Sequence, residues 1–256
     1  MKQRWITAIC LVAVLFPILY FGGWVFLAAA FVVLEISCYE MTRLMNRQWP
    51  AIFNISMYLC LAALLVGGYY GPQWFQVADM AVLIYLFAWL VFSPRIKLDE
   101  IAMMFVYFNL FGLLFMALNS FYAISRWLIF LMLAGTNVTD AFALFIGKAW
   151  GRHKMDERIS PHKTWEGALG GYLCGAVVTF VFGYCVIQRP LILIILAAVL
   201  EPAVGQVGDL AFSAIKRHFG VKDFGNILPG HGGIMDRLDS ICFNTILLYA
   251  LVLAFL

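Results

Sequence analysis

Nine apolar segments, each long enough to cross a lipid bilayer as a helix, dominate this sequence. A spanning helix needs about 20 mostly apolar residues. The segments lie near residues 5–21, 23–41, 51–70, 76–92, 101–119, 127–147, 167–187, 190–212 and 238–256. Only 12% of the residues are charged, whereas about a quarter are charged in a typical soluble domain. The sequence therefore predicts an all-α polytopic membrane protein with about nine transmembrane helices, and it excludes a water-soluble fold.

Segment 190–212 differs from the other segments because polar and helix-breaking residues interrupt its apolar pattern. These residues are Glu201, Pro202, Gly205, Gly208 and Asp209. Such residues in a spanning segment suit a broken helix or a closely packed one. We therefore expect a break or a close helix contact in this part of the chain.

The basic residues fall almost entirely on one side of the predicted helices. Fifteen of the seventeen Lys and Arg residues lie in the N-terminal stretch and in every second loop, whereas Arg126 and Arg189 lie on the opposite side. Cytoplasmic loops of membrane proteins carry an excess of Lys and Arg. We therefore expect a cytoplasmic N-terminus and a C-terminus on the opposite side. The two most polar segments, 148–166 and 213–240, would then both face the cytoplasm.

The sequence shows no linker, internal repeat or soluble domain. We expect a single integral-membrane domain over residues 1–256. Within it, residues 1–120 would form the N-terminal helices, and residues 121–256 would form the catalytic helices. The two polar cytoplasmic segments are the places where a water-soluble substrate could meet reactive side chains.

The segment 213–240 combines charged side chains with a glycine-rich turn. Its basic residues are Lys216, Arg217, Lys222 and Arg237, its acidic residues are Asp223, Asp236 and Asp239, and the turn is Pro229-Gly230-His231-Gly232-Gly233. Clustered glycines let successive backbone N–H groups turn towards one ligand and form an anion-binding nest. We expect Gly230, Gly232 and Gly233 to bind phosphate in this way. Alternatively, the basic residues form a solvated face or attract anionic lipid headgroups.

Several aspartates of the C-terminal half point to a metal ion. Asp236 and Asp239 are three residues apart at the predicted start of the last helix, so they share one face of it. Carboxylates beside phosphate-binding groups suit Mg²⁺, although the pair alone could simply be favourable charges at a helix N-terminus. Asp140 and Asp209 lie within apolar segments, where an ionisable residue is a functional candidate. We expect Asp140, Asp209 and Asp236 to surround one metal ion.

The segment just before residue 167 supplies a second candidate for phosphate binding. It contains Ser160-Pro161-His162-Lys163, which we expect to cap the following helix and to offer hydroxyl and ammonium donors to a phosphate, because a helix N-terminus is itself an anion site. Four other acidic residues lie singly in or near apolar segments: Glu35, Glu40, Asp79 and Glu201. For these we favour interfacial solvation or an interhelical hydrogen bond.

The residues of segment 213–240 resemble the signature of the CDP-diacylglycerol synthases, also called phosphatidate cytidylyltransferases. The matching positions are Ser213, Lys216, Arg217, Lys222, Asp223, Pro229, Gly230, His231, Gly232, Gly233, Asp236, Arg237, Asp239 and Ser240. Gly208-Asp209-Leu210, the run 160–167 and Asp140-x-x-Ala143-x-x-x-Gly147 are also similar to the family. Departures at Asn137, Leu144 and Phe212 leave open whether the chain is the housekeeping enzyme or a paralogue with a different lipid preference.

The resemblance implies a reaction in which CTP and phosphatidate give CDP-diacylglycerol and pyrophosphate. It places the enzyme in the bacterial inner membrane, with a cytoplasmic active site that uses Mg²⁺. Whether a second metal ion takes part is left open. The phosphate of phosphatidate should be largely dianionic at neutral pH. Catalysis must then overcome charge repulsion, which calls for positioning, Mg²⁺ and cationic donors rather than covalent chemistry.

The resemblance also suggests a role for each candidate residue. Asp209 and Asp236 would be the leading metal ligands, with Asp140, Asp223 and Asp239 as ligands or as their partners. Lys216, Arg217, Lys222 and Arg237 would neutralise phosphate oxygens, and Ser160, Lys163 and Ser213 would position them. His231 would either order the glycine turn or donate to phosphate.

Two other functions remain open at this point. One is a CTP-dependent membrane enzyme that acts on an isoprenoid lipid. The other is a transporter that uses Asp140 and Asp209 in broken helices. The concentration of polar residues on one side argues against a polar path through the bilayer. We expect a homodimer, from the family and from the prevalence of two-fold assemblies, and no nucleic-acid partner.

Overall fold

The computed structural model describes residue 13 and residues 16–45, 48–187, 190–228 and 232–256. In this part of the chain, eight helices are long and apolar enough to cross a membrane. They are α2 (Gly23–Met45), α3 (Ala51–Tyr70), α4 (Pro72–Phe92), α5 (Leu98–Ile124), α6 (Trp127–Trp150), α7 (Trp165–Phe182) with the π-helical turn η1 (Gly183–Ile187), α8 (Leu191–His218) and α9 (Met235–Phe255). The predicted all-α polytopic membrane fold is confirmed. Most of the first predicted segment, 5–21, lies outside the described residues.

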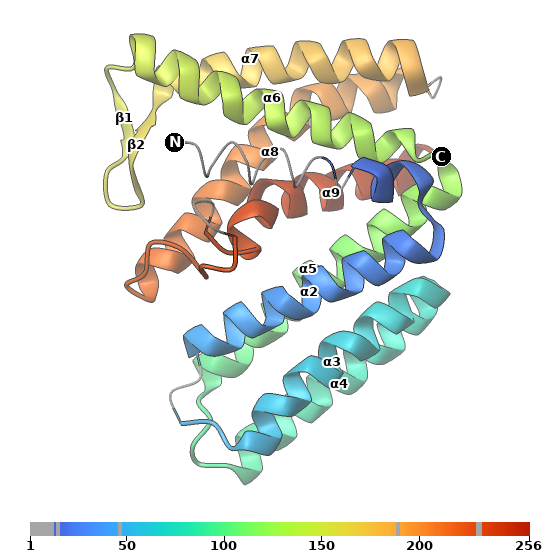
Figure 1. Ribbon diagram of the computed structural model, residues 1–256, viewed down its shortest axis with the longest axis vertical. Helices are drawn as coiled ribbons and strands as arrows, with labels where there is room; N and C mark the ends of the chain where they lie inside the picture. Colours follow the sequence, from blue (N-terminus) through green and yellow to red (C-terminus); the bar gives the residue numbers. More distant parts are fainter. Residues whose placement is uncertain (1–12, 14–15, 46–47, 188–189, 229–231) are drawn as a thin grey trace. The chain divides into compact units, whose positions relative to one another are not determined.

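The chain forms two compact units. Unit 1 consists of Met1–Tyr122 and Asp223–Asp236, and unit 2 consists of Ala123–Lys222 and Arg237–Leu256. In unit 1, α3 packs against both α4 and α2 (Figure 1). In unit 2, α6 and α7 lie side by side, and α8 contacts both of them (Figure 1).

The α3–α4 hairpin of unit 1 follows from its glycines and from one proline. Gly71 has a φ of 122°, a conformation that favours glycine, and Pro72 then occupies the first position of α4, where its fixed φ suits a helix start. A Cβ at Gly67 would lie 2.8 Å from the carbonyl oxygen of Trp74. The two helices can therefore turn back on each other within a single residue. Fully buried aromatic side chains of α5, such as Phe108 and Phe111, fill the core of the same unit.

Small residues bring α6 and α7 of unit 2 unusually close together. Gly167, Gly171 and Gly175 recur every four residues and therefore line one face of α7. A Cβ at Gly171 would lie 2.5 Å from the carbonyl oxygen of Thr139, and a Cβ at Gly167 would lie 2.6 Å from that of Ala143. Such close approach is typical of helix packing in membranes, and it fixes the stretch of α6 that carries Asp140.

Helix α8 is continuous, so segment 190–212 contains no break. Pro202 lies inside the helix, and the glycines that follow it provide close contacts instead. A Cβ at Gly205 would meet the side chain of Asn244, and one at Gly208 would lie 2.9 Å from the carbonyl oxygen of Asp239. The alternative expectation, close packing, is therefore the correct one.

Both polar segments contain more regular structure than expected. Helix α8 extends to His218 and α9 begins at Met235, so segment 213–240 is a loop only between these helices. The basic residues of the last turn of α8 suit its C-terminus because they compensate the helix dipole.

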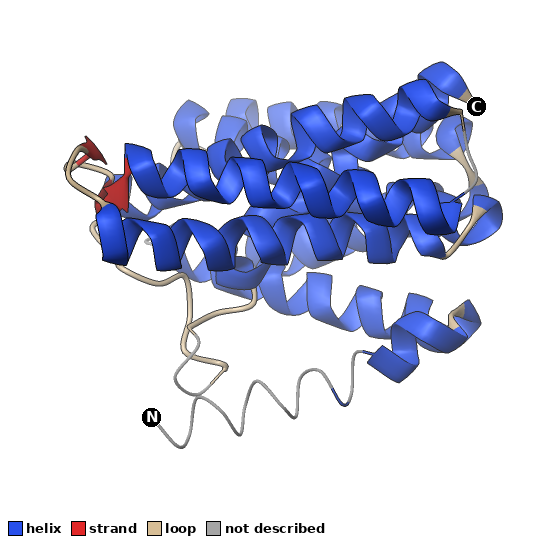
Figure 2. Ribbon diagram, turned by 90° about the horizontal axis from the view of Figure 1, so that it is seen from above, coloured by secondary structure: helices blue, strands red, loops and turns tan. Residues whose placement is uncertain are grey.

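Segment 148–166 holds an antiparallel hairpin of β1 (Lys154–Asp156) and β2 (Ser160–Thr164), which connects α6 to α7 at one end of these two helices (Figure 2). The prediction that Ser160 to Lys163 cap α7 is wrong, because these residues belong to β2. Thr164 is the cap, and its hydroxyl accepts a hydrogen bond from the N–H of Gly167 at 3.2 Å.

Candidate functional site

An ion pair between the hairpin and α8 is at the centre of the candidate site in unit 2. The Nζ atom of Lys163, on β2, lies 2.5 Å from Oδ2 of Asp209. The hydroxyl of Ser213, one helical turn further along α8, donates to Oδ1 of the same carboxylate at 3.4 Å. Both side chains of the ion pair remain partly exposed, at 28% and 27%. The pair is therefore held in place and is still accessible to a ligand.

Four more charged side chains of unit 2 surround this ion pair. Asp140 on α6 interacts electrostatically with Asp209, Lys163 and Arg237. Asp239 on α9 interacts with Asp209, Asp140 and Lys216. We call these six residues the mixed-charge cluster: Asp140, Lys163, Asp209, Lys216, Arg237 and Asp239. They come from α6, β2, α8 and α9, and all six are residues that the sequence predicted for the site.

The mixed-charge cluster has the chemistry to bind phosphate groups together with a metal ion. Its three ammonium or guanidinium groups can neutralise phosphate oxygens, and its three carboxylates provide the hard oxygen ligands that Mg²⁺ prefers. Within the described residues, however, no group of three or more His, Cys, Asp or Glu side chains is arranged to hold a metal ion. The donor types fit Mg²⁺, and the predicted ligand set stays a prediction.

Asp236, the third predicted metal ligand, belongs to unit 1 and binds backbone groups there. Its Oδ2 atom accepts hydrogen bonds from the N–H groups of Phe224 and Gly233, each at 2.9 Å. The residue is only 9% exposed. Gly232 has a φ of 84°, which favours glycine, and its carbonyl accepts from the N–H of Leu228. Asp236 thus holds the two ends of the glycine-rich loop together.

Glu40 on α2 is a second buried carboxylate that organises this loop. Its two oxygens accept from the N–H groups of Ile234 at 3.0 Å and Met235 at 2.9 Å, which lie at the start of α9. Glu40 is 1% exposed, and a Cβ at Gly225 or Gly233 would collide with its carboxylate. A carboxylate at a helix N-terminus satisfies free N–H groups and compensates the dipole. We call Glu40, Asp236 and residues 223–228 and 232–235 the capped loop.

Of the two expectations for Glu40, the interhelical hydrogen bond is confirmed by its contacts with the start of α9, but the sequence did not predict that it shapes the loop. The available signal was an acidic residue within an apolar segment together with Gly225 and Gly233, whose missing side chains leave room for a carboxylate. The partners of Glu40 lie 194 and 195 residues away. Local patterns in the sequence do not encode such a distant pairing.

The other predicted residues occupy varied positions. Arg217 stabilises the end of α8, because its guanidinium donates to the carbonyl oxygens of Ile159 and Val221 at 3.3 and 3.1 Å. Ser160 is half-buried in β2. Lys222 and Asp223 are exposed. The predicted roles of Gly230 and His231 fall outside the described residues.

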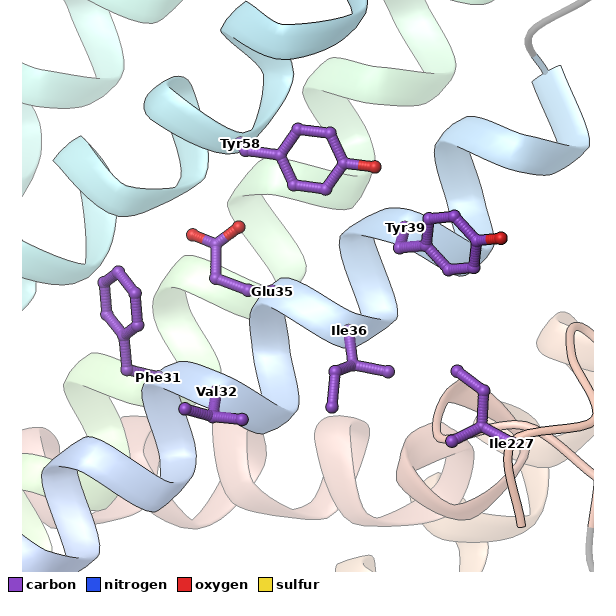
Figure 3. Close-up of a pocket in the computed structure, with 7 residues that line it drawn as sticks. All are labelled: Phe31, Val32, Glu35, Ile36, Tyr39, Tyr58 and Ile227. Carbon is purple, nitrogen blue, oxygen red and sulfur yellow. The ribbon is translucent and has the colours of Figure 1, made fainter. Parts of the chain in front are cut away.

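An apolar groove in unit 1 can be set aside as a phosphate site. It has a volume of about 370 Å³ and lies between α2, α3 and Ile227 (Figure 3). Its walls are Phe31, Val32, Glu35, Ile36, Tyr39, Tyr58 and Ile227. The only charged side chain among them is Glu35, whose carboxyl group extends between the aromatic rings (Figure 3). The walls hold no basic side chain that could bind a phosphate.

The fold and the mixed-charge cluster define an integral-membrane protein suited to phosphate chemistry, and comparison with known proteins gives its family. The model of the cytidylyltransferase family matches residues 2–255, so the chain belongs to this family. A phosphatidate cytidylyltransferase of Staphylococcus epidermidis is 33% identical over 99% of both chains. One from Staphylococcus aureus is 34% identical over 99% of both chains. The family resemblance seen in the sequence is confirmed, and it extends over the whole chain.

Proposed function

We propose that this protein transfers the cytidylyl group of CTP to phosphatidate, giving CDP-diacylglycerol and pyrophosphate, and that the mixed-charge cluster binds the reacting phosphates. The reaction follows from the family and from relatives that align over nearly the full chain. These relatives give no support to an isoprenoid substrate or to transport. The observation that supports this location of the phosphate-binding site is the accessible ion pair of Lys163 and Asp209, which has charged side chains from three helices around it.

The basic residues of the cluster address the main obstacle to this reaction. A phosphate dianion must approach a triphosphate, and negative charge develops on the departing pyrophosphate. Lys163, Lys216 and Arg237 would neutralise these oxygens, and fixed cationic donors stabilise such charge most effectively when they are positioned in advance. Lys163 is held by Asp209, so its ammonium group is already oriented before a nucleotide arrives.

The carboxylates of the cluster would hold Mg²⁺. We assign Asp209 as its principal ligand, with Asp140 and Asp239 nearby, and the expectation that Asp236 is also a ligand rests on the sequence alone. Bound Mg²⁺ would supply charge neutralisation at the phosphate oxygens. Lys163 contacts Asp209, so its ammonium group would be available to neutralise an oxygen of a phosphate bound beside this carboxylate. A second metal ion remains part of the proposal without an assigned ligand set.

The capped loop would supply backbone donors to a phosphate. Gly232 and Gly233 adjoin two carboxylates that fix the loop shape, and Gly230 and His231 are assigned to the same turn. Lys222 and Asp223 lie at its exposed beginning. Ser213 and Ser160 would orient Asp209 and the hairpin, and Arg217 would hold the hairpin against the end of α8.

We place the protein in the bacterial inner membrane with the site facing the cytoplasm. Fifteen of the seventeen Lys and Arg residues fall on one side of the predicted helices, and the relatives named above come from bacteria. CTP would then arrive from the cytoplasm, and phosphatidate from the adjacent leaflet. We keep the homodimer as a further proposal, based on the prevalence of two-fold assemblies.

The test is an assay of the purified protein in mixed micelles with radiolabelled CTP. We expect a labelled CDP-lipid with phosphatidate and Mg²⁺, and none after EDTA treatment until Mg²⁺ is restored. Polyprenyl phosphate offered in place of phosphatidate separates the two lipid classes. A labelled product from the polyprenyl lipid but none from phosphatidate would overturn the proposed acceptor, and full activity in EDTA would overturn the metal.

A further inference from the structure

A second polar cluster lies in unit 2, among the central parts of four spanning helices. Its members are Thr136 on α6, Thr179 on α7, Glu201 on α8 and Asn244 on α9. All four are buried, with exposures of 3%, 0%, 0% and 1%. None of them belongs to the mixed-charge cluster. A buried ionisable residue inside a membrane span is a functional candidate in its own right.

This cluster contains more hydrogen-bond acceptors than donors. Within the described residues, neither oxygen of Glu201 has a hydrogen-bond partner of good geometry, and the same holds for Thr179 Oγ1 and Asn244 Oδ1. The Thr179 hydroxyl lies near Glu201 and has only one proton to donate. Thr136 cannot help, since its hydroxyl donates to the carbonyl of Met132 and accepts from Asn244 Nδ2 at 2.7 Å. Buried polar atoms nearly always have a hydrogen-bond partner or a bound ion. A hydrogen-bond donor or a cation is therefore expected beside these oxygens.

Two glycines leave the space in which these oxygens lie. A Cβ at Gly135 would collide with Thr179 Oγ1 and would lie 3.2 Å from Glu201 Oε2. A Cβ at Gly205 would lie 3.2 Å from Asn244 Oδ1. Gly205 is four residues after Glu201 and therefore on the same face of α8. Thr179 Oγ1 and Glu201 Oε2 thus lie around one position beside Gly135, and Asn244 Oδ1 lies beside α8 one helical turn from Glu201.

The charge of this cluster identifies the kind of ligand. None of the ion pairs in the described part of the chain involves Glu201. Its carboxylate would carry a single negative charge, which a monovalent cation would balance, whereas a divalent cation would leave net positive charge in an apolar interior. Carboxylate, hydroxyl and amide oxygens are suitable ligands for a hard cation.

We propose that Glu201, Thr179 and Asn244 bind one alkali cation, Na⁺ or K⁺, between α7, α8 and α9. The cation joins helices that carry parts of the mixed-charge cluster, since α8 bears Asp209 and α9 bears Asp239. It therefore stabilises unit 2 without contacting the nucleotide. A protonated Glu201 is the competing explanation: its O–H would donate to one neighbouring oxygen, and the stability of the protein would then not depend on the alkali cation.

Thermal unfolding of the purified protein in detergent, followed by tryptophan fluorescence, tests this site. NaCl or KCl is titrated against N-methylglucamine chloride at constant ionic strength. We expect the Tm of the wild-type protein to rise and saturate with at least one of the two cations. Glu201→Gln should abolish this dependence. Thr179→Val keeps the shape of the side chain and removes one ligand oxygen, so it should shift the titration midpoint to higher cation concentration.

Two control variants separate this site from other carboxylates. Asp79→Asn changes another acidic residue within a spanning helix, where Asn109 donates to it at 3.0 Å, and Asp209→Asn changes the mixed-charge cluster. Both should keep the cation dependence. If Glu201→Gln does not fold, binding of ²²Na⁺ or ⁸⁶Rb⁺ to the wild-type and Thr179→Val proteins replaces its titration. No cation dependence in the wild type, or equal dependence in the wild type and Glu201→Gln, would overturn the proposal. The assay measures no turnover, so its result tests the cation site independently of the proposed cytidylyl transfer.

Discussion

The mixed-charge cluster and the capped loop both contain buried or half-buried carboxylates, but these carboxylates have different partners in the two regions. In the mixed-charge cluster, Asp209 faces the ammonium group of Lys163, and both side chains remain partly exposed. In the capped loop, Glu40 and Asp236 accept from backbone N–H groups and are almost completely buried. The first arrangement leaves charges that can exchange one partner for another, as a substrate requires. The second fixes a backbone conformation. Substitutions in the mixed-charge cluster should therefore lower the catalytic activity, and substitutions in the capped loop should lower the stability of the fold.

The largest effect should come from Asp209→Asn. This change removes the central negative charge of the mixed-charge cluster and, in our proposal, the principal metal ligand. We expect kcat to fall by about 10²–10³-fold, the loss typical of removing one electrostatic group from an active site. The folded protein should persist, since a partly exposed ion pair typically contributes about 1 kcal/mol or less to stability. Radiolabelled CTP turnover and the Tm, measured on the same preparation, check both statements. Near wild-type turnover would remove Asp209 from the site.

Lys163→Met should have the next largest effect and should again act on activity. A hydrogen bond to a charged group is worth about 1.5–3 kcal/mol, so kcat/KM for CTP should fall by about 10- to 100-fold. Lys163→Arg keeps the charge and serves as the matched control, with a smaller loss. If Lys163→Met lowers the Tm strongly and leaves kcat/KM unchanged, the ion pair is structural, and the contrast between the two regions fails.

Glu40→Gln should reverse the pattern by lowering stability first. The glutamine side chain has only one acceptor oxygen, so one of the N–H groups of Ile234 and Met235 would lose its partner. A buried group left unsatisfied in this way costs about 1–3 kcal/mol. Thermal unfolding should show a lower Tm, accompanied by a higher KM for CTP when the loop loses its shape. Glu35→Gln, on the same helix but in the apolar groove, is the control, and we expect its Tm to change less.

The difference between the two regions also explains what the sequence could predict. Helix positions follow from long apolar runs, which are local, and the predicted segment 51–70 coincides with α3. The residues of the mixed-charge cluster could be named because charges within apolar segments are conspicuous, as with Asp140 and Asp209. The partners of these residues could not be predicted. The pair of Lys163 and Asp209 depends on a hairpin that cannot be predicted from short polar stretches. The role of Glu40 depends on backbone N–H groups, which every residue except proline has.

The smallest effect should come from Gly232→Ala. Together with a control variant, it separates two effects on stability: backbone strain at a positive φ, and a collision with a carboxylate of the capped loop. Gly232 has a φ of 84°, where an alanine costs about 1–2 kcal/mol. A Cβ there would also lie 2.9 Å from Asp236 Oδ2. Gly220 has a φ of 68° with open space around it, so Gly220→Ala measures the strain without the contact.

We expect both variants to lower the free energy of unfolding, and Gly232→Ala to lower it more, because Asp236 must shift and weaken its bonds to Phe224 and Gly233. The two variants are compared by chemical denaturation in the same detergent. Equal losses would mean that the position of Asp236 is not tightly fixed. Since the capped loop derives its shape from the buried carboxylates, that result would contradict the structural role assigned to Asp236.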